Sequence, residues 1–301
     1  MSKTATTTTN LLTTATLATA TNSLVTASLA TCIFIDGSYY NFYRYHSLLT
    51  WWKNAFPEDL ECLLDPYQNP LFLEKFKKTF IKNIKDLKKN LKIDKQIDPI
   101  LIVGKDCKRQ DIWRTKLFPQ YKGTRNTDQN SGFMGGPFFK MVYEEKLFLE
   151  AGAQAILKHP HLEADDCIAI SVKHVLNVYP LATVYIITSD KDYLQLAEPR
   201  IHLYNLAFKK LTDQKSSTND PKCDLFCKIV MGDPSDNITA VFPKCGPKTA
   251  LKYFADQELF KERLNSSTEF QKKYELNSTL IDFNNIPENL VSEFMNNFTS
   301  E

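Results

Sequence analysis

The chain has 301 residues, of which 43% are apolar and 24% are charged, and its formal net charge is +2. This composition is typical of an ordinary soluble globular chain with one large domain or two modest ones. No stretch is apolar enough to span a bilayer, so no membrane partner is expected. The seven cysteines include no CxxC pair, which favours a reduced intracellular compartment, nucleus or cytoplasm, over a secreted disulfide scaffold.

Residues 1–31 are almost wholly Thr, Ala, Leu, Ser and Asn, with Lys3 as their single charge. Threonines interrupt every apolar run, whereas a signal peptide would carry one continuous apolar stretch and a transit peptide would be rich in arginine. We therefore predict that residues 1–31 are a low-complexity, disordered tail outside the fold.

Beyond the tail, short apolar runs alternate with helical patterns, which predicts a doubly wound, mostly parallel α/β sheet with flanking helices. The runs at Ile33, Leu101 and Val184 are β-branched and do not alternate with polar residues, as in strands buried on both faces. From Leu71 to Lys95, apolar residues recur every three or four positions with lysines between them. That spacing predicts one amphipathic helix with a basic outer face.

Carboxylates follow these apolar runs at or near their ends. Parallel sheets bind ligands at the carboxyl ends of their strands, and so many like charges would be unfavourable together unless cations neutralised them. The near-neutral net charge then conceals a segregated distribution, with basic groups on other surfaces. The nine acids are Asp36, Asp106, Glu163, Asp165, Asp166, Asp190, Asp192, Asp233 and Asp236.

The spacing of these acids suits a pair of metal ions. Glu163 and Asp165 lie two positions apart at an expected helix start, and Asp190 and Asp192 follow an expected strand. Ligands that offer only oxygen suit Mg²⁺, with Mn²⁺ as a substitute, rather than zinc. Two such ions about 4 Å apart can activate a water and stabilise the leaving oxygen of a phosphodiester.

Five sequence blocks resemble the flap endonuclease superfamily of structure-specific 5' nucleases, and most closely its branch of T-even-phage-type ribonuclease H and phage 5'-3' exonucleases. The resemblance runs from about Thr31 to the C-terminus. It implies a PIN-like nuclease domain over residues 32–220, with an arch over about 107–140, and a helix-three-turn-helix DNA-binding region and tail over 221–301. The blocks are FIDGSYYNF, VGKDCKRQDIWRTKLFPQYKGTR, LEADDCIAI, ITSDKDYLQL and GDPSDNITAVFPKCGPKTALKYF.

The resemblance implies a role for each acid. Asp36, Asp106, Glu163 and Asp165 would hold the first metal, with Asp166 close by. Asp190, Asp192 and Asp236 would hold the second metal, with Asp233 helping or lying just outside it. Which carboxylate touches which ion is left open.

Other positions would contact the substrate. Lys122 and Arg125 would stand at the base of the arch, where Lys offers charge to the scissile phosphate and Arg grips phosphate with two hydrogen bonds. Phe42 would stack on the terminal base pair, although a buried core Phe is the alternative. Tyr121 is counted among the DNA contacts.

The last block resembles the family's DNA-binding hairpin. Gly246 and a helix that begins at Pro247 and Lys248 would present free backbone amides to one DNA strand. Ala240 and Pro243 stand near positions where the family often has glycine, so close backbone approach in the first half of the hairpin is in doubt. Lys244, Lys248 and Lys252 would still grip the duplex.

The expected activity is a two-metal 5'-3' exonuclease and flap endonuclease that removes RNA primers or 5' flaps from duplex DNA, with ribonuclease H activity, during replication or repair. Its partners would be duplex DNA with a flap, an RNA–DNA hybrid or a 5' end. The resemblance leans toward a monomeric viral replication enzyme working beside separate proteins such as a clamp or a single-strand-binding protein, although no motif names one. The alternatives are a PIN-type single-strand ribonuclease and an inactive branched-DNA-binding factor.

Overall fold

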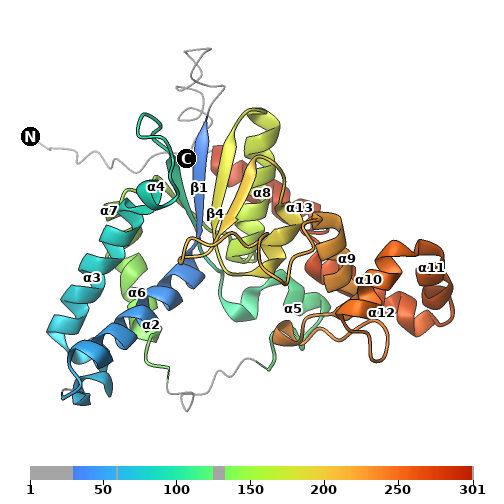
Figure 1. The fold of residues 1–301 in the computed structure, drawn as a ribbon, viewed down its shortest axis with the longest axis horizontal. Coiled ribbons are helices and arrows are strands. Elements are labelled where there is room, and N and C mark those ends of the chain that lie inside the picture. Colours follow the sequence, from blue (N-terminus) through green and yellow to red (C-terminus); the bar gives the residue numbers. More distant parts are fainter. Residues whose placement is uncertain (1–29, 59, 125–132, 300–301) are drawn as a thin grey trace, which may run out of the picture.

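A five-stranded parallel sheet lies at the centre of the protein (Figure 1). The computed structural model describes residues 30–58, 60–124 and 133–299. The strand order is β3-β2-β1-β4-β5, so β1 is central and the chain winds outward from it in both directions. The strands are β1 (Thr31–Asp36), β2 (Ile100–Gly104), β3 (Ala155–Leu157), β4 (Thr183–Ile187) and β5 (Ile201–Tyr204).

The predicted mostly parallel α/β sheet is confirmed, with β1, β2 and β4 at the runs expected to be strands. Asp36 pairs with Gly104, and Ile35 pairs with Ile187, so these three strands end at one edge of the sheet. The tail prediction was one residue too long, because Thr31 pairs with Thr183 and begins β1. The rest of the predicted tail, up to residue 29, lies outside the described residues.

Helices cover both faces of the sheet (Figure 1). On one face, α2, α3, α6 and α7 pack against Ile33, Ile35 and Val103, and on the other face α8 and α13 pack against Phe34 and Ile186. Alternate residues of β1 thus enter separate hydrophobic cores, which is why that strand has no polar face. The α-helices are α2 (Gly37–Ala55), α3 (Pro70–Lys85), α4 (Leu87–Asn90), α5 (Trp113–Leu117), α6 (Gly136–Glu144), α7 (Leu147–Glu150), α8 (Ala164–Val178), α9 (Pro221–Met231), α10 (Pro247–Ala255), α11 (Gln257–Asn265), α12 (Thr268–Ile281) and α13 (Glu288–Thr299).

Short 3₁₀ helices fill several of the connections. The two that carry predicted site residues are η7 and η8, which follow β4 and α9. Within the described residues the 3₁₀ helices are η3 (Glu61–Leu63), η4 (Pro66–Gln68), η5 (Arg109–Asp111), η7 (Lys191–Leu196) and η8 (Pro234–Asp236).

The amphipathic helix predicted from Leu71 to Lys95 is wrong at its C-terminal end. The Asn69 side chain accepts hydrogen bonds from two backbone amides and begins α3 at Pro70, but α3 ends at Lys85. A second short helix, α4, follows, and Lys92 then takes a left-handed conformation with φ 57°. The apolar spacing continued past Lys85 because Leu87 and Leu91 still reach the same core, not because the helix continues.

Helices α9 to α12 form a helical region beside the sheet, whereas α13 returns to it (Figure 1). Leu290 and Phe294 of α13 lie in the core that contains α8. The predicted boundary between residues 220 and 221 coincides with the start of α9, but the C-terminal segment belongs to the sheet by its packing. Within the described ranges, no helix has the length and apolar character needed to cross a membrane.

Candidate active site

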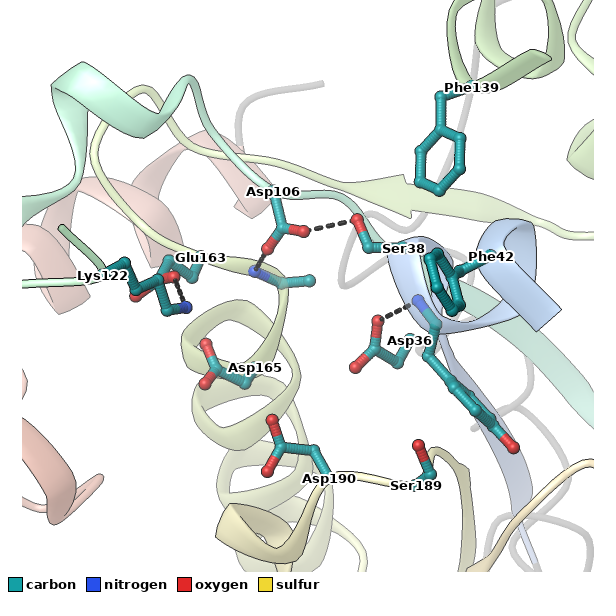
Figure 2. Close-up of a pocket in the computed structure, with 12 residues that line it drawn as sticks. Asp36, Ser38, Phe42, Asp106, Lys122, Phe139, Glu163, Asp165, Ser189 and Asp190 are labelled. Carbon is teal, nitrogen blue, oxygen red and sulfur yellow. Dashed lines mark hydrogen bonds and ion pairs between the residues drawn. The ribbon is translucent and has the colours of Figure 1, made fainter. Parts of the chain in front are cut away.

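The carboxyl ends of β1, β2 and β4 open into a cavity of about 370 Å³ (Figure 2). Figure 2 shows Asp36, Asp106, Asp165 and Asp190 around a shared space, although they come from four separate segments. The sequence prediction placed all four in one site, and the structure brings them together. The cavity is lined by Asp36, Ser38, Tyr39, Phe42, Asp106, Lys122, Phe139, Glu163, Ala164, Asp165, Ser189 and Asp190.

Asp36 and Asp106 are held in place by helix starts. Asp36 is the last residue of β1 and caps α2, where its Oδ1 accepts a hydrogen bond of 3.0 Å from the Tyr39 amide. Asp106 accepts one of 2.8 Å from the Ala164 amide at the start of α8, and another from the Ser38 hydroxyl. Burial, followed by the charge of Asp106, raises the pKa of Asp36 to about 7. The carboxylates of Asp36 and Asp106 therefore have too little positive charge around them.

Glu163, Asp165 and Asp166 lie at the start of α8, as predicted. Glu163 and Asp166 form a reciprocal capping box, with the Glu163 amide donating to Asp166 Oδ2 at 3.1 Å. Burial, followed by the charges of Asp166 and Glu163, raises the pKa of Asp165 well above its usual value. One oxygen from each of these three acids lies within 4.8 Å of the others, which is the spacing of a cation site.

Asp166 is turned away from the cavity into a buried ion pair. Arg114, only 2% exposed, donates to both its carboxylate oxygens, at 2.7 and 2.8 Å, and Trp113 Nε1 donates to Oδ2 at 2.9 Å. Because both oxygens are already occupied, these contacts favour a supporting role for Asp166 over the metal ligation that the sequence suggested. Its ligand role stays a prediction, and one that the geometry does not favour.

Arg114 also links distant elements. Its Nη1 donates to Glu163 at 2.9 Å, and its Nε donates to the Leu280 carbonyl of α12 at 2.7 Å. Sequence reasoning missed this residue, although it lies within the quoted block WRTKLFPQYKGTR. An arginine among other basic residues gives no sign that it points inward. The apolar residues just before it, Ile112 and Trp113, are both buried and were the available signal.

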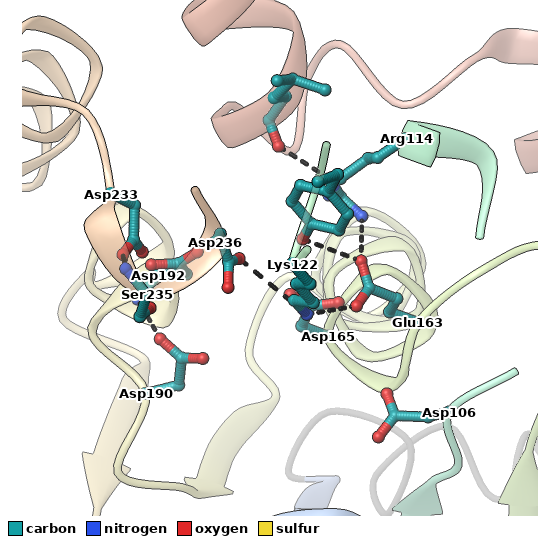
Figure 3. A network of polar contacts seen from close by, with 12 residues as sticks. Asp106, Arg114, Lys122, Glu163, Asp165, Asp190, Asp192, Asp233, Ser235 and Asp236 are labelled. Carbon is teal, nitrogen blue, oxygen red and sulfur yellow. Dashed lines mark hydrogen bonds and ion pairs between the residues drawn. The ribbon is translucent and has the colours of Figure 1, made fainter. Parts of the chain in front are cut away.

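Lys122 lies beside Glu163, as the predicted arch base requires, and forms an ion pair with its Oε1. Its Nζ is 3.9 Å from Asp236, so Lys122 stands between the two predicted carboxylate sets (Figure 3). The Lys122 amide donates to the Asp236 carbonyl at 3.0 Å, and Arg109 donates to the Lys122 carbonyl. Burial acts to raise the pKa of Glu163, but Lys122 and Arg114 outweigh it, and the pKa is lowered.

The other two predictions near the arch have different outcomes. Tyr121 is 5% exposed, and its hydroxyl donates to Glu163 Oε2 at 3.0 Å. It thus supports Glu163 from behind, and this burial does not favour the DNA contact predicted for it. Arg125 lies outside the described residues.

A second carboxylate group consists of Asp192, Asp233 and Asp236, with one oxygen from each within 4.8 Å of the others (Figure 3). Lys228 of α9 is paired with Asp192 and lies 2.9 Å from Asp233. Burial acts to raise the pKa of Asp233, but Lys228 and Ser235 lower it to about 2. The sequence prediction included the three acids and missed Lys228, because nothing in the pattern of α9 shows which of its faces meets η7.

The two groups thus differ in charge compensation. In the first group, which consists of Asp36, Asp106, Glu163 and Asp165, the carboxylates outnumber the nearby cations, and the pKa values of Asp36 and Asp165 are raised. The second group already holds Lys228. Both donor sets consist of carboxylate oxygens, which fit hard divalent cations such as Mg²⁺ or Mn²⁺. A cation at the first group would relieve a repulsion, and a cation at the second group would compete with Lys228.

Phe42 is 51% exposed and lines the cavity, which excludes the alternative of a buried core position. Its ring is stacked on Phe133, with centroids 5.7 Å apart and an interplanar angle of 28°. Phe139 also lines the cavity, and Figure 2 shows it on the same side as Phe42. This wall of the cavity therefore presents aromatic rings, which sequence reasoning had identified only at Phe42.

The predicted hairpin lies between α9 and α10. Gly246 precedes α10, which begins at Pro247 as expected, and a Cβ at Gly246 would meet no atom within 4 Å. The backbone at the helix start is therefore open to a ligand. Lys244, Lys248 and Lys252 are all exposed, so the side chains predicted to grip a duplex are accessible.

Comparisons with known proteins agree with this architecture. Residues 31–222 match the family of the 5'-3' exonuclease N-terminal, resolvase-like domain. The chain is 28% identical to ribonuclease H of Enterobacteria phage T4 over 217 residues, which is 65% of this chain and 68% of the relative. It is also 28% identical to DNA polymerase I of Rhizobium leguminosarum over 172 residues, which is 54% of this chain and only 16% of that polymerase.

Solved structures show the same fold. The protein from bacteriophage T5 crystallised with metal ions superimposes with a TM-score of 0.61 at 16% identity, covering 90% of this chain and all of that one. The T5 5'-exonuclease with bound zinc has a TM-score of 0.62 at 16% identity, over 89% and 98% of the two chains. The T5 flap endonuclease in a pseudo-enzyme-product complex with DNA and metal ions has a TM-score of 0.59 at 16% identity, over 89% and 97%. By its family match, the chain belongs to the 5'-3' exonuclease family of the flap endonuclease superfamily.

Proposed function

We propose that this chain is a divalent-metal-dependent 5' nuclease that removes RNA primers and short 5' flaps from duplex DNA. The observation that carries the proposal is the cavity where Asp36, Asp106, Asp165 and Asp190 surround one space beside Lys122. Four carboxylates around one space require positive charge, and divalent cations bound there would offset both the carboxylates and the negative charge of a phosphodiester.

Asp36, Asp106, Glu163 and Asp165 would hold the first cation, and Asp190, Asp192 and Asp236 would hold the second, with Asp233 beside it. Asp166 acts in this proposal through Arg114, by holding Glu163 in position. Bound there, Mg²⁺ or Mn²⁺ would activate a water and offset the charge on the leaving oxygen of the phosphodiester.

The protein's own groups do the rest. Lys122, at the wall of the cavity, offers its ammonium to the scissile phosphate, which carries negative charge through the reaction. Phe42 offers an exposed ring on which the terminal base can stack, a contact that tolerates any sequence. The open backbone before α10, with Lys248, suits a phosphate of the duplex. Recognition of strand ends by shape follows, because these contacts do not read base identity.

A 5'-labelled RNA primer on DNA and a 5' DNA flap test the proposal, each incubated with Mg²⁺ and with chelator. The native protein should release short 5' products in Mg²⁺ and none in chelator. Asp190→Asn and Lys122→Ala should retain substrate binding and lose cleavage. The matched controls are Asp98→Asn and Lys82→Ala. Asp98 precedes the start of β2, at the end of that strand away from the cavity, and Lys82 lies on the exposed side of α3.

The alternatives give different results in the same assay. A PIN-type ribonuclease would cut free single-stranded RNA as well as the annealed primer. An inactive binding factor would bind the flap and cut nothing with Mg²⁺ or Mn²⁺. The second result would overturn the proposed function.

A further inference from the structure

Tyr193 is a buried residue on which the charges of the cavity's carboxylates act. It is carried by η7, directly after Asp192, and its side chain is fully buried. Its ring packs in the core of α8 and α13, 6.1 Å from the ring of Phe283. Its hydroxyl is also buried and has no hydrogen-bond partner among the described residues.

The surroundings of this hydroxyl are acidic. Burial raises the pKa of Tyr193 well above its usual value, and the charges of Asp36, Asp165, Asp190 and Asp106 raise it further, in that order. These four are the acids that face one another across the cavity (Figure 2). The buried phenol is a hydrogen-bond donor close to these carboxylate acceptors, yet it donates to none of them here.

Three other hydroxyl groups near these acids behave differently. Ser38 donates to Asp106, Tyr121 donates to Glu163, and Thr188 lies within 3.4 Å of Asp36 Oδ2. Each of them already helps to orient a carboxylate. Buried polar groups in folded proteins nearly always have partners, so the unpartnered hydroxyl of Tyr193 points to an acceptor that comes into place when the site is loaded.

Resting on the proposed metal dependence, we propose that Tyr193 is a positioning residue, whose hydroxyl donates to a carboxylate oxygen of the first group when a divalent cation is bound. A cation bound by these carboxylates would draw their oxygens together and bring one of them within reach of the buried hydroxyl. Hydrogen bonds from outside the ligand set commonly orient metal-binding carboxylates. Without the cation, Tyr193 contributes only its ring.

The test is Tyr193→Phe, which removes the hydroxyl and keeps the ring. Mn²⁺ binding is measured by calorimetry, and the melting temperature is measured with chelator and with Mn²⁺. We expect the variant to melt at or above the native temperature in chelator, because an unpaired buried hydroxyl is lost. Its affinity for Mn²⁺ should fall by about 10- to 100-fold, so Mn²⁺ should raise its melting temperature less.

Tyr40→Phe is the matched control, because that buried hydroxyl donates to the Phe80 carbonyl at 2.9 Å. This variant should melt lower than the native protein and bind Mn²⁺ with unchanged affinity. An unchanged Mn²⁺ affinity in Tyr193→Phe would overturn the inference and leave the proposed function standing. Failure of the native protein to bind Mn²⁺ or Mg²⁺ would overturn both.

Discussion

Arg114 and Asp166 form a buried two-point ion pair, with Nη2 to Oδ1 at 2.7 Å and Nη1 to Oδ2 at 2.8 Å. The pair joins α5 to the first turn of α8, and Arg114 also contacts Glu163. Charges of this kind are costly to bury and become unfavourable when one partner is removed. The geometry of Glu163 therefore depends on a residue that does not line the cavity.

Arg114→Met should lower the free energy of unfolding by about 3–5 kcal/mol, because it leaves the buried carboxylate of Asp166 without its cation and leaves Glu163 with Lys122 alone. The comparison variant is Arg200→Met. Arg200 pairs with Glu198 at 2.7 Å in a partly exposed ion pair, and its replacement should lower the free energy of unfolding by less than about 1 kcal/mol. Urea unfolding of the two variants measures the difference. Equal losses would show that the buried pair has no special role.

Without metal, the protein should lose stability as pH rises through the range from about 4 to 7. The pKa of Asp36 is raised to about 7, against about 3.9 for an unfolded chain, so the folded state holds a proton that the unfolded state releases. Between these values stability falls with increasing pH. Melting in chelator at several pH values should show this slope, and Asp36→Asn should flatten it.

Divalent cations should counteract this loss of stability at higher pH. They bind the ionised carboxylates, so Mg²⁺ or Mn²⁺ should raise the melting temperature more at pH 8 than at pH 6. Asp165, whose pKa is also raised, adds to the same effect. A metal-induced shift that is independent of pH would contradict this linkage.

Lys228→Met should have opposite effects on the free protein and on metal binding. Loss of its ion pairs with Asp192 and Asp233 lowers stability in chelator, while removal of a competing cation strengthens the weaker of two Mn²⁺ binding steps. Partly exposed pairs are worth up to about 1 kcal/mol each, so the loss of two should give a gain of up to about 30-fold in that step. Calorimetry with Mn²⁺ measures it, and Lys261→Met, which removes an exposed pair with Glu258, should change neither step.

Phe42→Ala should weaken binding to a flap substrate by about 1–3 kcal/mol, the usual value of base stacking on an aromatic ring. Fluorescence anisotropy with a labelled flap measures the loss. Phe56→Ala tests specificity, because Phe56 is also exposed but lies after the opposite end of α2. Equal losses for the two variants would remove the case for a stacking site at Phe42.

The central strands and the first carboxylate group could be predicted because each depends on local signals. Continuous β-branched runs identified β1, β2 and β4, and acids directly after β1 and β4 must reach the carboxyl edge of a parallel sheet. The end of α3 could not be predicted in this way. Leu87 and Leu91 keep the helical spacing, although the helix has already ended at Lys85.

The basic side chains of the site were harder to predict from the sequence than its acids. Lys122 was found through a motif, but Arg114 and Lys228 are basic residues on helices, which in most proteins face water. Their direction depends on how α5 and α9 dock against α8 and η7, and no local pattern encodes that docking. Asp166 shows the same limit, because it stands beside Asp165 in sequence while its carboxylate faces Arg114 instead of the cavity.

The hydrogen bond between Arg114 and the Leu280 carbonyl joins residues 166 positions apart. Gln195 makes a similar link, since its amide donates to the Ile281 carbonyl at 3.0 Å and accepts from the Phe283 amide at 2.8 Å. On the ribosome, the residues that line the cavity are made long before these late partners. A nascent chain would therefore carry every acid of the site without the framework that holds Glu163, until the residues up to Phe283 have also been made.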